Sequence, residues 1–201
     1  TVDLHHVREL RRAKIEGDSS TFEAAERLKR LEFDLARMSD TTLVVSPVER
    51  EIMLKEDPSL KVDVLPNIHE TVPRTTNFSD RKGLMFVGSF AHTPNLDAIR
   101  YFVEYIFPLI KKELPRTEFY VIGDLAGRDV KKFVSEGVIF TGHVRDLLPY
   151  FERCKVYVAP LRYGAGLKGK IGESMAYGLP VVTTSIGAEG MYLEHLKTAL
   201  I

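Results

Sequence analysis

Short apolar runs alternate with segments of helical periodicity along most of the chain. Beyond residue 83, these runs are rich in Val, Ile, Phe and Tyr, which favour strands. The predicted strands lie at residues 84–87, 119–122, 138–140, 156–159 and 180–183. Between them, the apolar periodicity predicts helices near 95–113, 127–135, 145–153 and 168–177. Because the runs are continuously apolar rather than alternating, we expect a parallel sheet that is covered by helices on both faces.

The first part of the chain predicts a different arrangement, which starts with two helices. Residues 4–14 have helical periodicity, and a second helix is expected to begin at a Ser20-x-x-Glu23 capping box. Apolar residues recur along this second helix at the spacing of a single helical face. That face, which we expect to be packed, consists of Phe22, Ala25, Leu28, Leu31, Leu35 and Met38.

A β-α-β unit follows these helices. Apolar runs at 42–45 and 61–65 predict strands, and Ser46 followed by Pro47 predicts the start of the helix between them. The pattern then lapses into prolines, asparagines and threonines, which predicts a linker. The last part has the alternation of a doubly wound, Rossmann-like α/β domain. We therefore expect three parts, comprising residues 1–66, 67–82 and 83–201.

Composition narrows the possible classes of function. The 28 basic and 28 acidic residues of this 201-residue chain cancel, so we expect no nucleic-acid partner. The single cysteine, Cys154, excludes an internal disulfide framework and favours a reducing compartment, so we expect a cytoplasmic protein. No apolar run approaches the roughly 18 residues of a membrane span, although peripheral membrane contact stays open for the full-length protein. The abrupt ends of the sequence predict a fragment of a larger protein.

A glycine-rich loop joins the strand at 156–159 to the next predicted helix. Three glycines within residues 164–169 leave backbone amides bare where the helix begins, an arrangement that binds anions such as diphosphates. Lys168 and Lys170 lie in or near the first turn, where a cation is unfavourable unless an anion is present. Solvated surface lysines would have the same spacing, so both interpretations stay open. Glu173, one turn further on, either accepts hydrogen bonds from a ribose diol or faces solvent.

Several motifs occur together along the chain. The run Gly172-Glu-Ser-Met-Ala-Tyr-Gly-Leu-Pro-Val-Val182 resembles the Glu-Ala-Met-Ala-x-Gly-x-Pro-Val-Val signature of retaining glycosyltransferases of family 4, which have the GT-B fold. Further motifs precede it in the family's order: Val44-Val45-Ser46 with Glu49, Val64-Leu65-Pro66-Asn67, Phe86-Val87-Gly88, Val121-Ile122-Gly123, Phe140-Thr141-Gly142 and Val156-Tyr157-Val158-Ala159-Pro160. The resemblance implies that residues 1–66 end the acceptor-side domain and that 83–201 form most of the donor-side domain, the C-terminal half of a GT-B fold.

The resemblance also implies a function and a site. It implies transfer of a sugar, with retained anomeric configuration, from a nucleoside diphosphate sugar to an acceptor that the sequence does not identify. No motif requires a metal ion or another cofactor. The donor would bind through Gly88, Ser89, His143, Val144, Arg162, Gly166, Leu167, Lys168, Lys170 and Glu173. Glu173 would contact the ribose and the loop amides the diphosphate, while the cationic side chains would stabilise the diphosphate as it departs.

Departures from the family pattern leave alternatives open. Ala165 stands where the family has its first signature glutamate, although a subgroup with Gly-x-Gly-x-Lys-x-Lys is more similar, and Ile68 replaces the usual glycine after Pro-Asn. The acceptor-side loops are not in this sequence, so we expect an isolated chain that is catalytically incomplete. One alternative is a non-catalytic subunit that binds nucleotide sugars, and another is a GT-B sugar-nucleotide epimerase. Glu189, flanked by glycines, recurs in the subgroup, but a simple turn explains it almost as well.

Overall fold

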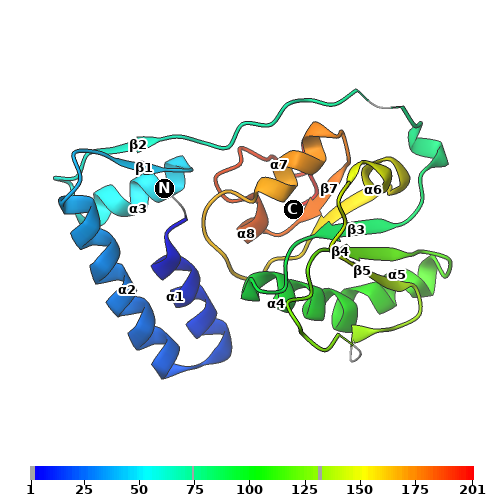
Figure 1. Cartoon of the computed structure of the whole chain (residues 1–201), viewed down its shortest axis with the longest axis horizontal. Helices are drawn as coiled ribbons and strands as arrows, with labels where there is room; N and C mark the ends of the chain where they lie inside the picture. Colours follow the sequence, from blue (N-terminus) through cyan, green and yellow to red (C-terminus); the bar gives the residue numbers. More distant parts are fainter. Residues whose placement is uncertain (1–2, 74, 131–132) are drawn as a thin grey trace. The chain divides into compact units, whose positions relative to one another are not determined.

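The computed structural model describes residues 3–73, 75–130 and 133–201, and Figure 1 traces the whole chain. The chain divides into two compact units, which do not follow the sequence strictly. The first unit consists of Thr1–Ile68, Tyr163–Lys168 and Ser185–Leu193, and the second of His69–Arg162, Gly169–Thr184 and Glu194–Ile201. Two short segments from the predicted third part, including most of the glycine-rich loop, therefore belong to the first unit.

The second unit is built on a parallel sheet that has five strands among the described residues. In spatial order these are β5 (Val138–Gly142), β4 (Phe119–Ile122), β3 (Leu84–Val87), β6 (Val156–Ala159) and β7 (Val181–Thr183). Leu84 pairs with Phe119 on one side and with Val156 on the other, so β3 lies at the centre. The chain moves outward from β3 first in one direction and then in the other, which is the doubly wound topology expected from the sequence.

Helices cover both faces of this sheet. One continuous helical segment consists of α4 (Thr93–Tyr101), a π-helical turn η2 (Phe102–Ile106) and α5 (Phe107–Glu113). It covers one face, while α6 (Leu148–Arg153) and α7 (Gly169–Ala176) cover the other (Figure 1). Met85 and Phe86, whose side chains point to opposite faces, are 0% and 1% exposed. The continuous apolar runs therefore reflect burial on both faces, as predicted.

The first unit contains α1 (His5–Glu16), α2 (Ser19–Arg37) and a small parallel sheet. Its strands, β1 (Thr42–Val44) and β2 (Val62–Val64), are joined through α3 (Pro47–Glu56). Ser46 caps α3 by accepting a hydrogen bond from the Glu49 amide at 3.2 Å, and Pro47 occupies the first turn, as predicted. The core gathers Leu4, Phe33, Ala36, Val44, Met53, Leu60 and Val62. This unit also contains α8 (Ser185–Ala188), which comes from the predicted third part of the chain.

Two predictions about α2 were wrong. The helix is capped by Asp18, whose carboxylate accepts hydrogen bonds from the amides of Ser20 (3.0 Å) and Thr21 (3.2 Å), so Ser20 is inside the helix. The predicted apolar face is also largely exposed, at Phe22, Leu31, Leu35 and Met38. The buried residues are Ala25, Phe33 and Ala36, because small side chains allow close packing and the aromatic ring of Phe33 joins the core.

Two predicted helices in the second unit also differ. No α-helix occurs at residues 127–130 or 133–135; the two positions between these ranges lie outside the described residues. Ala126 and Gly127 have φ angles of 50° and 69°, which a right-handed helix does not tolerate. The helix expected from 145 begins only at Leu148, where the carboxylate of Asp146 accepts a hydrogen bond from the Leu148 amide at 2.9 Å.

Among the described residues, no helix has the length and apolar character needed to cross a bilayer.

The reactivity of the single cysteine, Cys154, tests whether the core of the second unit is as closely packed as the structure shows. Cys154 is fully buried beside β3, and burial raises the pKa of its thiol to about 12. Because the thiolate is the reactive species, iodoacetamide at about pH 8 should label the folded protein about a thousandfold more slowly than the unfolded protein. Mass spectrometry with and without denaturant measures the two rates. Comparable rates would show that this part of the core opens readily.

Candidate nucleotide-sugar site

The carboxyl edge of the second unit's sheet brings several predicted site residues to its topological switch point. Gly88 and Ser89 follow the central strand β3, and Arg162 follows its neighbour β6 shortly after the strand ends. In open α/β sheets, ligands bind outside the carboxyl ends of the strands where the winding direction reverses. In this sheet that reversal falls between β3 and β6. The sequence therefore placed Gly88, Ser89 and Arg162 at the edge where such a ligand is expected.

The loop after β3 is packed against the side chain of Asn95. A Cβ atom at Gly88 would lie 2.5 Å from Nδ2 of Asn95, so a larger residue here would require the Asn95 side chain to move. The Asn95 amide donates to the Ser89 carbonyl at 2.9 Å, and the Ser89 hydroxyl accepts a hydrogen bond from the Ala91 amide at 3.2 Å. The loop is thus fixed before any ligand arrives. The Asn95 side chain thus stabilises this loop from within α4.

Arg162 is held in place by α4. Its Nε lies 2.9 Å from Oδ2 of Asp97, its Nη2 hydrogen-bonds Oδ1, and its guanidinium lies 5.2 Å from the centre of the Tyr101 ring. A bidentate carboxylate pair fixes the plane of a guanidinium more firmly than a single contact. No local pattern indicated Asp97 as the partner, because the two residues are 65 positions apart. Arg162 is therefore a pre-oriented cation whose charge is already shared with a carboxylate.

Lys170 and Glu173 lie on the first turns of α7. Lys170 Nζ is 2.6 Å from Glu173 Oε2, so the side chains predicted to contact the diphosphate and the ribose pair with each other. The buried residues of this helix are Ile171 and Ser174, which leaves the Lys170–Glu173 pair on a more exposed part. A Cβ at Gly172 would lie 2.6 Å from Nε2 of His69. His69 lies in the predicted linker and was not among the predicted donor-binding residues.

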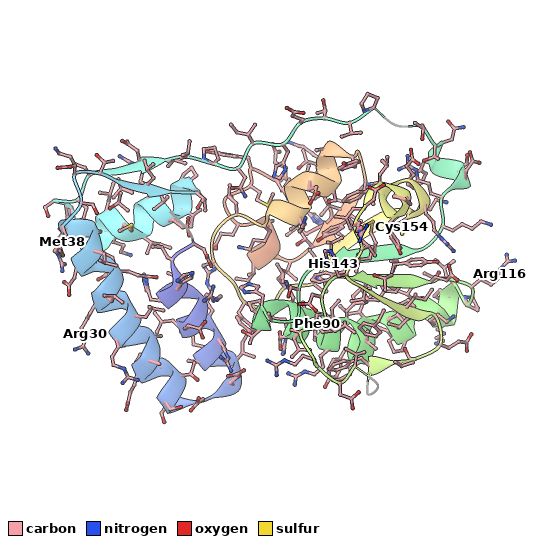
Figure 2. All side chains as sticks on the ribbon, viewed as in Figure 1. Arg30, Met38, Phe90, Arg116, His143 and Cys154 are labelled. Carbon is pink, nitrogen blue, oxygen red and sulfur yellow. The ribbon has the colours of Figure 1, made fainter. Side chains whose placement is uncertain are left out.

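His143 and Val144 follow β5, at the edge of the sheet. They are separated from the loop after β3 by one intervening strand, β4, which corresponds to roughly 10 Å across the sheet. Figure 2 labels His143 and Phe90, and Phe90 packs edge-on against Phe140 with ring centroids 6.1 Å apart. This ring contact links the loop after β3 to the strand that leads to His143.

The remaining predicted residues, Gly166, Leu167 and Lys168, belong to the first unit. Gly166 has a φ of 66°, and a Cβ there would lie 2.6 Å from Cβ of Asp3, so both conformation and space require glycine. The Lys168 ammonium donates to the Gly166 carbonyl at 2.6 Å. Burial lowers the pKa of Lys168 to about 8, although Glu189 opposes this shift. Lys168 is thus a half-buried cation whose pKa lies well below the usual range of a lysine.

The same unit contains two buried or half-buried charges near the loop. Glu49, which is 3% exposed, accepts hydrogen bonds from the amides of Leu4 (2.9 Å) and Val45 (3.2 Å), and burial raises its pKa. Arg11 of α1 binds Glu189 and the Gly164 carbonyl. Nothing in the local sequence around Arg11 indicated this role, since its partners lie more than 150 positions away. Among the residues that the structure describes, no group of His, Cys, Asp and Glu could hold a metal ion.

A parallel sheet that is wound in both directions from β3 and covered by helices on both faces defines an α/β protein of the doubly wound, Rossmann-like class. The family model of "Glycosyl transferases group 1" matches residues 81–201, more than half of the sequence. The chain therefore belongs to this glycosyltransferase family.

Individual proteins and solved structures are also similar to the chain. An uncharacterized 44.6 kDa protein in the cps region of Klebsiella pneumoniae is 27% identical over 131 residues, which cover 59% of this chain and 33% of the relative. Among solved structures, TarM is 17% identical with a TM-score of 0.70, over 87% of this chain and 36% of TarM. Anabaena HepE, solved with UDP and glucose, is 15% identical with a TM-score of 0.63, over 84% of this chain and 51% of HepE. These likenesses support the GT-B fold, and the chain spans about a third to a half of these relatives.

Proposed function

We propose that this chain binds the donor of a retaining, family 4-like glycosyltransferase, which transfers a sugar from a nucleoside diphosphate sugar to an acceptor. The observation that carries the proposal is the loop that ends at Lys168 and continues directly into α7 with Lys170 and Glu173. Its amides, cations and carboxylate are the groups that a nucleoside diphosphate requires. HepE, a structural neighbour, was solved with UDP and glucose, which supports this choice of ligand class.

The proposed chemistry is one of positioning and charge stabilisation. The bond between the anomeric carbon and the diphosphate oxygen breaks, and the acceptor hydroxyl attacks that carbon from the same face and gives its proton to the departing diphosphate, so the configuration is retained. The N-terminus of α7, Lys168, Lys170 and Arg162 stabilise the negative charge that grows on the departing diphosphate. We propose that Glu173 holds the ribose, that His143 and Val144 flank the base, and that neither a metal ion nor another cofactor takes part.

We further propose that transfer requires acceptor-side residues that the 201 residues do not supply. The share of each relative that the chain covers, 33% to 51% for those compared above, supports this proposal. The balanced charge and buried Cys154 support a cytoplasmic site of action without a nucleic-acid partner. Peripheral membrane contact would then be a property of the full-length protein.

A ligand panel tests the proposal. At one shared concentration, UDP, GDP and ADP should each stabilise the fold, and the tighter binder should stabilise it more, by about 2.7 kcal/mol where the concentration is a hundred times the dissociation constant, whereas NAD should not stabilise it. The shift should survive addition of EDTA, because no metal is proposed. Thermal unfolding monitored by circular dichroism is a suitable measurement. Stabilisation by NAD alone, or by none of the three diphosphates, would refute the proposed function.

Ala165 favours a second candidate, a subunit that binds nucleotide sugars without transferring them. Alanine cannot form the hydrogen bonds to sugar hydroxyls that the family's first signature glutamate is expected to form. Both candidates predict nucleotide binding, so the panel does not separate them. Release of UDP from a UDP-sugar by the full-length protein, followed by NMR, does: turnover supports the transferase, and binding without turnover supports the subunit.

A further inference from the structure

The guanidinium of Arg11, in the first unit, contacts two loops that both lie more than 150 positions away from it in the sequence. Arg11 of α1 donates from Nη1 to the Gly164 carbonyl at 2.7 Å and to Glu189 Oε2 at 2.7 Å. Its Nη2 donates to Glu189 Oε1 at 2.6 Å, which completes a bidentate pair. Both side chains are about three-quarters buried, at 24% and 23% exposure. The pair is therefore partly shielded from water, unlike an ordinary surface ion pair.

Both loops are closely packed on the amino-terminal part of the same unit. Gly190, next to Glu189, has a φ of 75°, and a Cβ there would lie 2.7 Å from Cβ of Ser46 at the start of α3. Gly166, in the glycine-rich loop, approaches Asp3 equally closely. A loop rich in glycine has many conformations of similar energy, so contacts that select one conformation reduce the entropy lost on binding. Arg11 supplies such a contact at the start of the loop.

The charges around Lys168 form one electrostatic group within this unit. Burial is the main cause of its lowered pKa, Glu189, Glu49 and Asp3 oppose the shift, and Arg11 adds to it. Desolvation by itself raises the pKa of the Glu189 carboxylate. The hydrogen bond and the charge of Arg11 lower it by more, so the pKa of Glu189 is lowered overall. Removing Arg11 should therefore raise the pKa of Lys168, and neutralising Glu189 should lower it.

We propose that Arg11 is a positioning residue for the nucleoside diphosphate: by holding the Gly164 carbonyl and Glu189 together, it fixes the loop that presents Gly166, Leu167 and Lys168. The inference rests on the proposed function of that loop. It assigns a part in donor binding to α1, a helix of the first unit that does not belong to the five-stranded sheet. Arg11 itself does not touch the donor in this proposal, and it acts through the backbone and through the charge of Lys168.

The first test compares Arg11→Gln with a matched control on the same helix. Arg12→Gln removes a neighbouring arginine whose ion pairs, with Glu9 and Glu16, both lie within α1, so it leaves the contacts of Arg11 with Gly164 and Glu189 in place. In the 201-residue chain, calorimetric titration with UDP, GDP and ADP should show about tenfold weaker binding for Arg11→Gln and no change for Arg12→Gln. Arg11→Lys should be intermediate, because an ammonium lacks the planar fork that makes the bidentate contact.

The second test uses pH, to which a merely structural role would not respond. In the wild type, affinity should fall above about pH 8 as Lys168 loses its proton. Arg11→Gln should shift this fall to higher pH, and Glu189→Gln should shift it to lower pH. Opposite shifts support the proposal, whereas shifts in the same direction, or no shift in either variant, overturn it.

The two proposals fail in different ways. If the wild type binds none of the three nucleotides, the proposed function is wrong. If the wild type binds but Arg11→Gln equals Arg12→Gln in affinity, the positioning role is wrong and the proposed function stands. Circular dichroism of each variant checks folding, and if Arg11→Gln is unfolded, Arg11→Lys and Glu189→Gln decide the question by the affinity and pH readouts.

Discussion

Replacing Gly123 with alanine is expected to lower the free energy of unfolding of the second unit by about 4 kcal/mol. Gly123 directly follows β4 and has a φ of 142°, a conformation that is essentially restricted to glycine. A Cβ at this position would lie 2.2 Å from the Gly88 carbonyl oxygen, a backbone atom that cannot move aside without disturbing β3. Backbone strain and steric overlap therefore add, each at about 1–3 kcal/mol. Urea-induced unfolding followed by circular dichroism measures the loss.

Gly127 provides the matched control in the same connection. It also has a positive φ, 69°, but a Cβ there would meet no atom within 4 Å. Gly127→Ala should therefore cost only the backbone strain, about 1 kcal/mol. If Gly123→Ala destabilises the protein no more than Gly127→Ala does, the close approach of the loops after β3 and β4 does not exist in solution.

The strands of the second unit could be predicted almost to the residue. Residues 84–87, 119–122 and 156–159 were expected as strands and are strands, because a parallel strand buried on both faces is a continuous apolar run in the sequence. The helix expected near 127–135 failed for a local reason, since the positive φ values at Ala126 and Gly127 are not encoded by apolar spacing. Periodicity thus located the sheet but not every connection.

The face of α2 failed for a different reason. Large apolar residues at helical spacing predicted that Leu31, Leu35 and Met38 would be packed, yet all three are exposed, and Met38 is 84% exposed. The spacing of Ala25, Phe33 and Ala36 fits a helix equally well, and only the tertiary partner decides which stripe is buried. Figure 2 shows Arg30 and Met38 on the outer side of α2.

The candidate site could be located from motifs, but its ion pairs could not. Glycines at 88, 123 and 166 were identifiable because each marks a turn that follows a buried strand. The partners of the cations were not, because Arg162 binds Asp97 and Arg11 binds Glu189 across long stretches of chain. A carboxylate that is 65 or 178 positions away leaves no trace in local spacing. Long-range charge pairing is therefore the part of this site that required the structure.

Substitution of Lys170 or Glu173 is expected to weaken nucleotide binding by about tenfold or more without unfolding the protein. The two side chains pair with each other at 2.6 Å, and an ion pair as exposed as this one contributes little to stability. In the proposed complex, each side chain has a different part of the ligand to bind. Lys170→Ala should weaken UDP binding but leave UMP binding unchanged, because the lysine is proposed to contact the terminal phosphate.

Glu173→Gln should show the complementary selectivity, because a carboxylate accepts two strong hydrogen bonds from vicinal hydroxyls and an amide oxygen accepts weaker ones. It should weaken UDP binding by about tenfold and leave binding of a 2′,3′-dideoxy analogue unchanged. Lys197 and Glu194, an ion pair of the same spacing in the same unit, supply the controls Lys197→Ala and Glu194→Gln, which should bind every ligand as the wild type does. Calorimetric titration of the four variants separates the roles. Unchanged UDP affinity in both Lys170→Ala and Glu173→Gln would remove α7 from the proposed donor site.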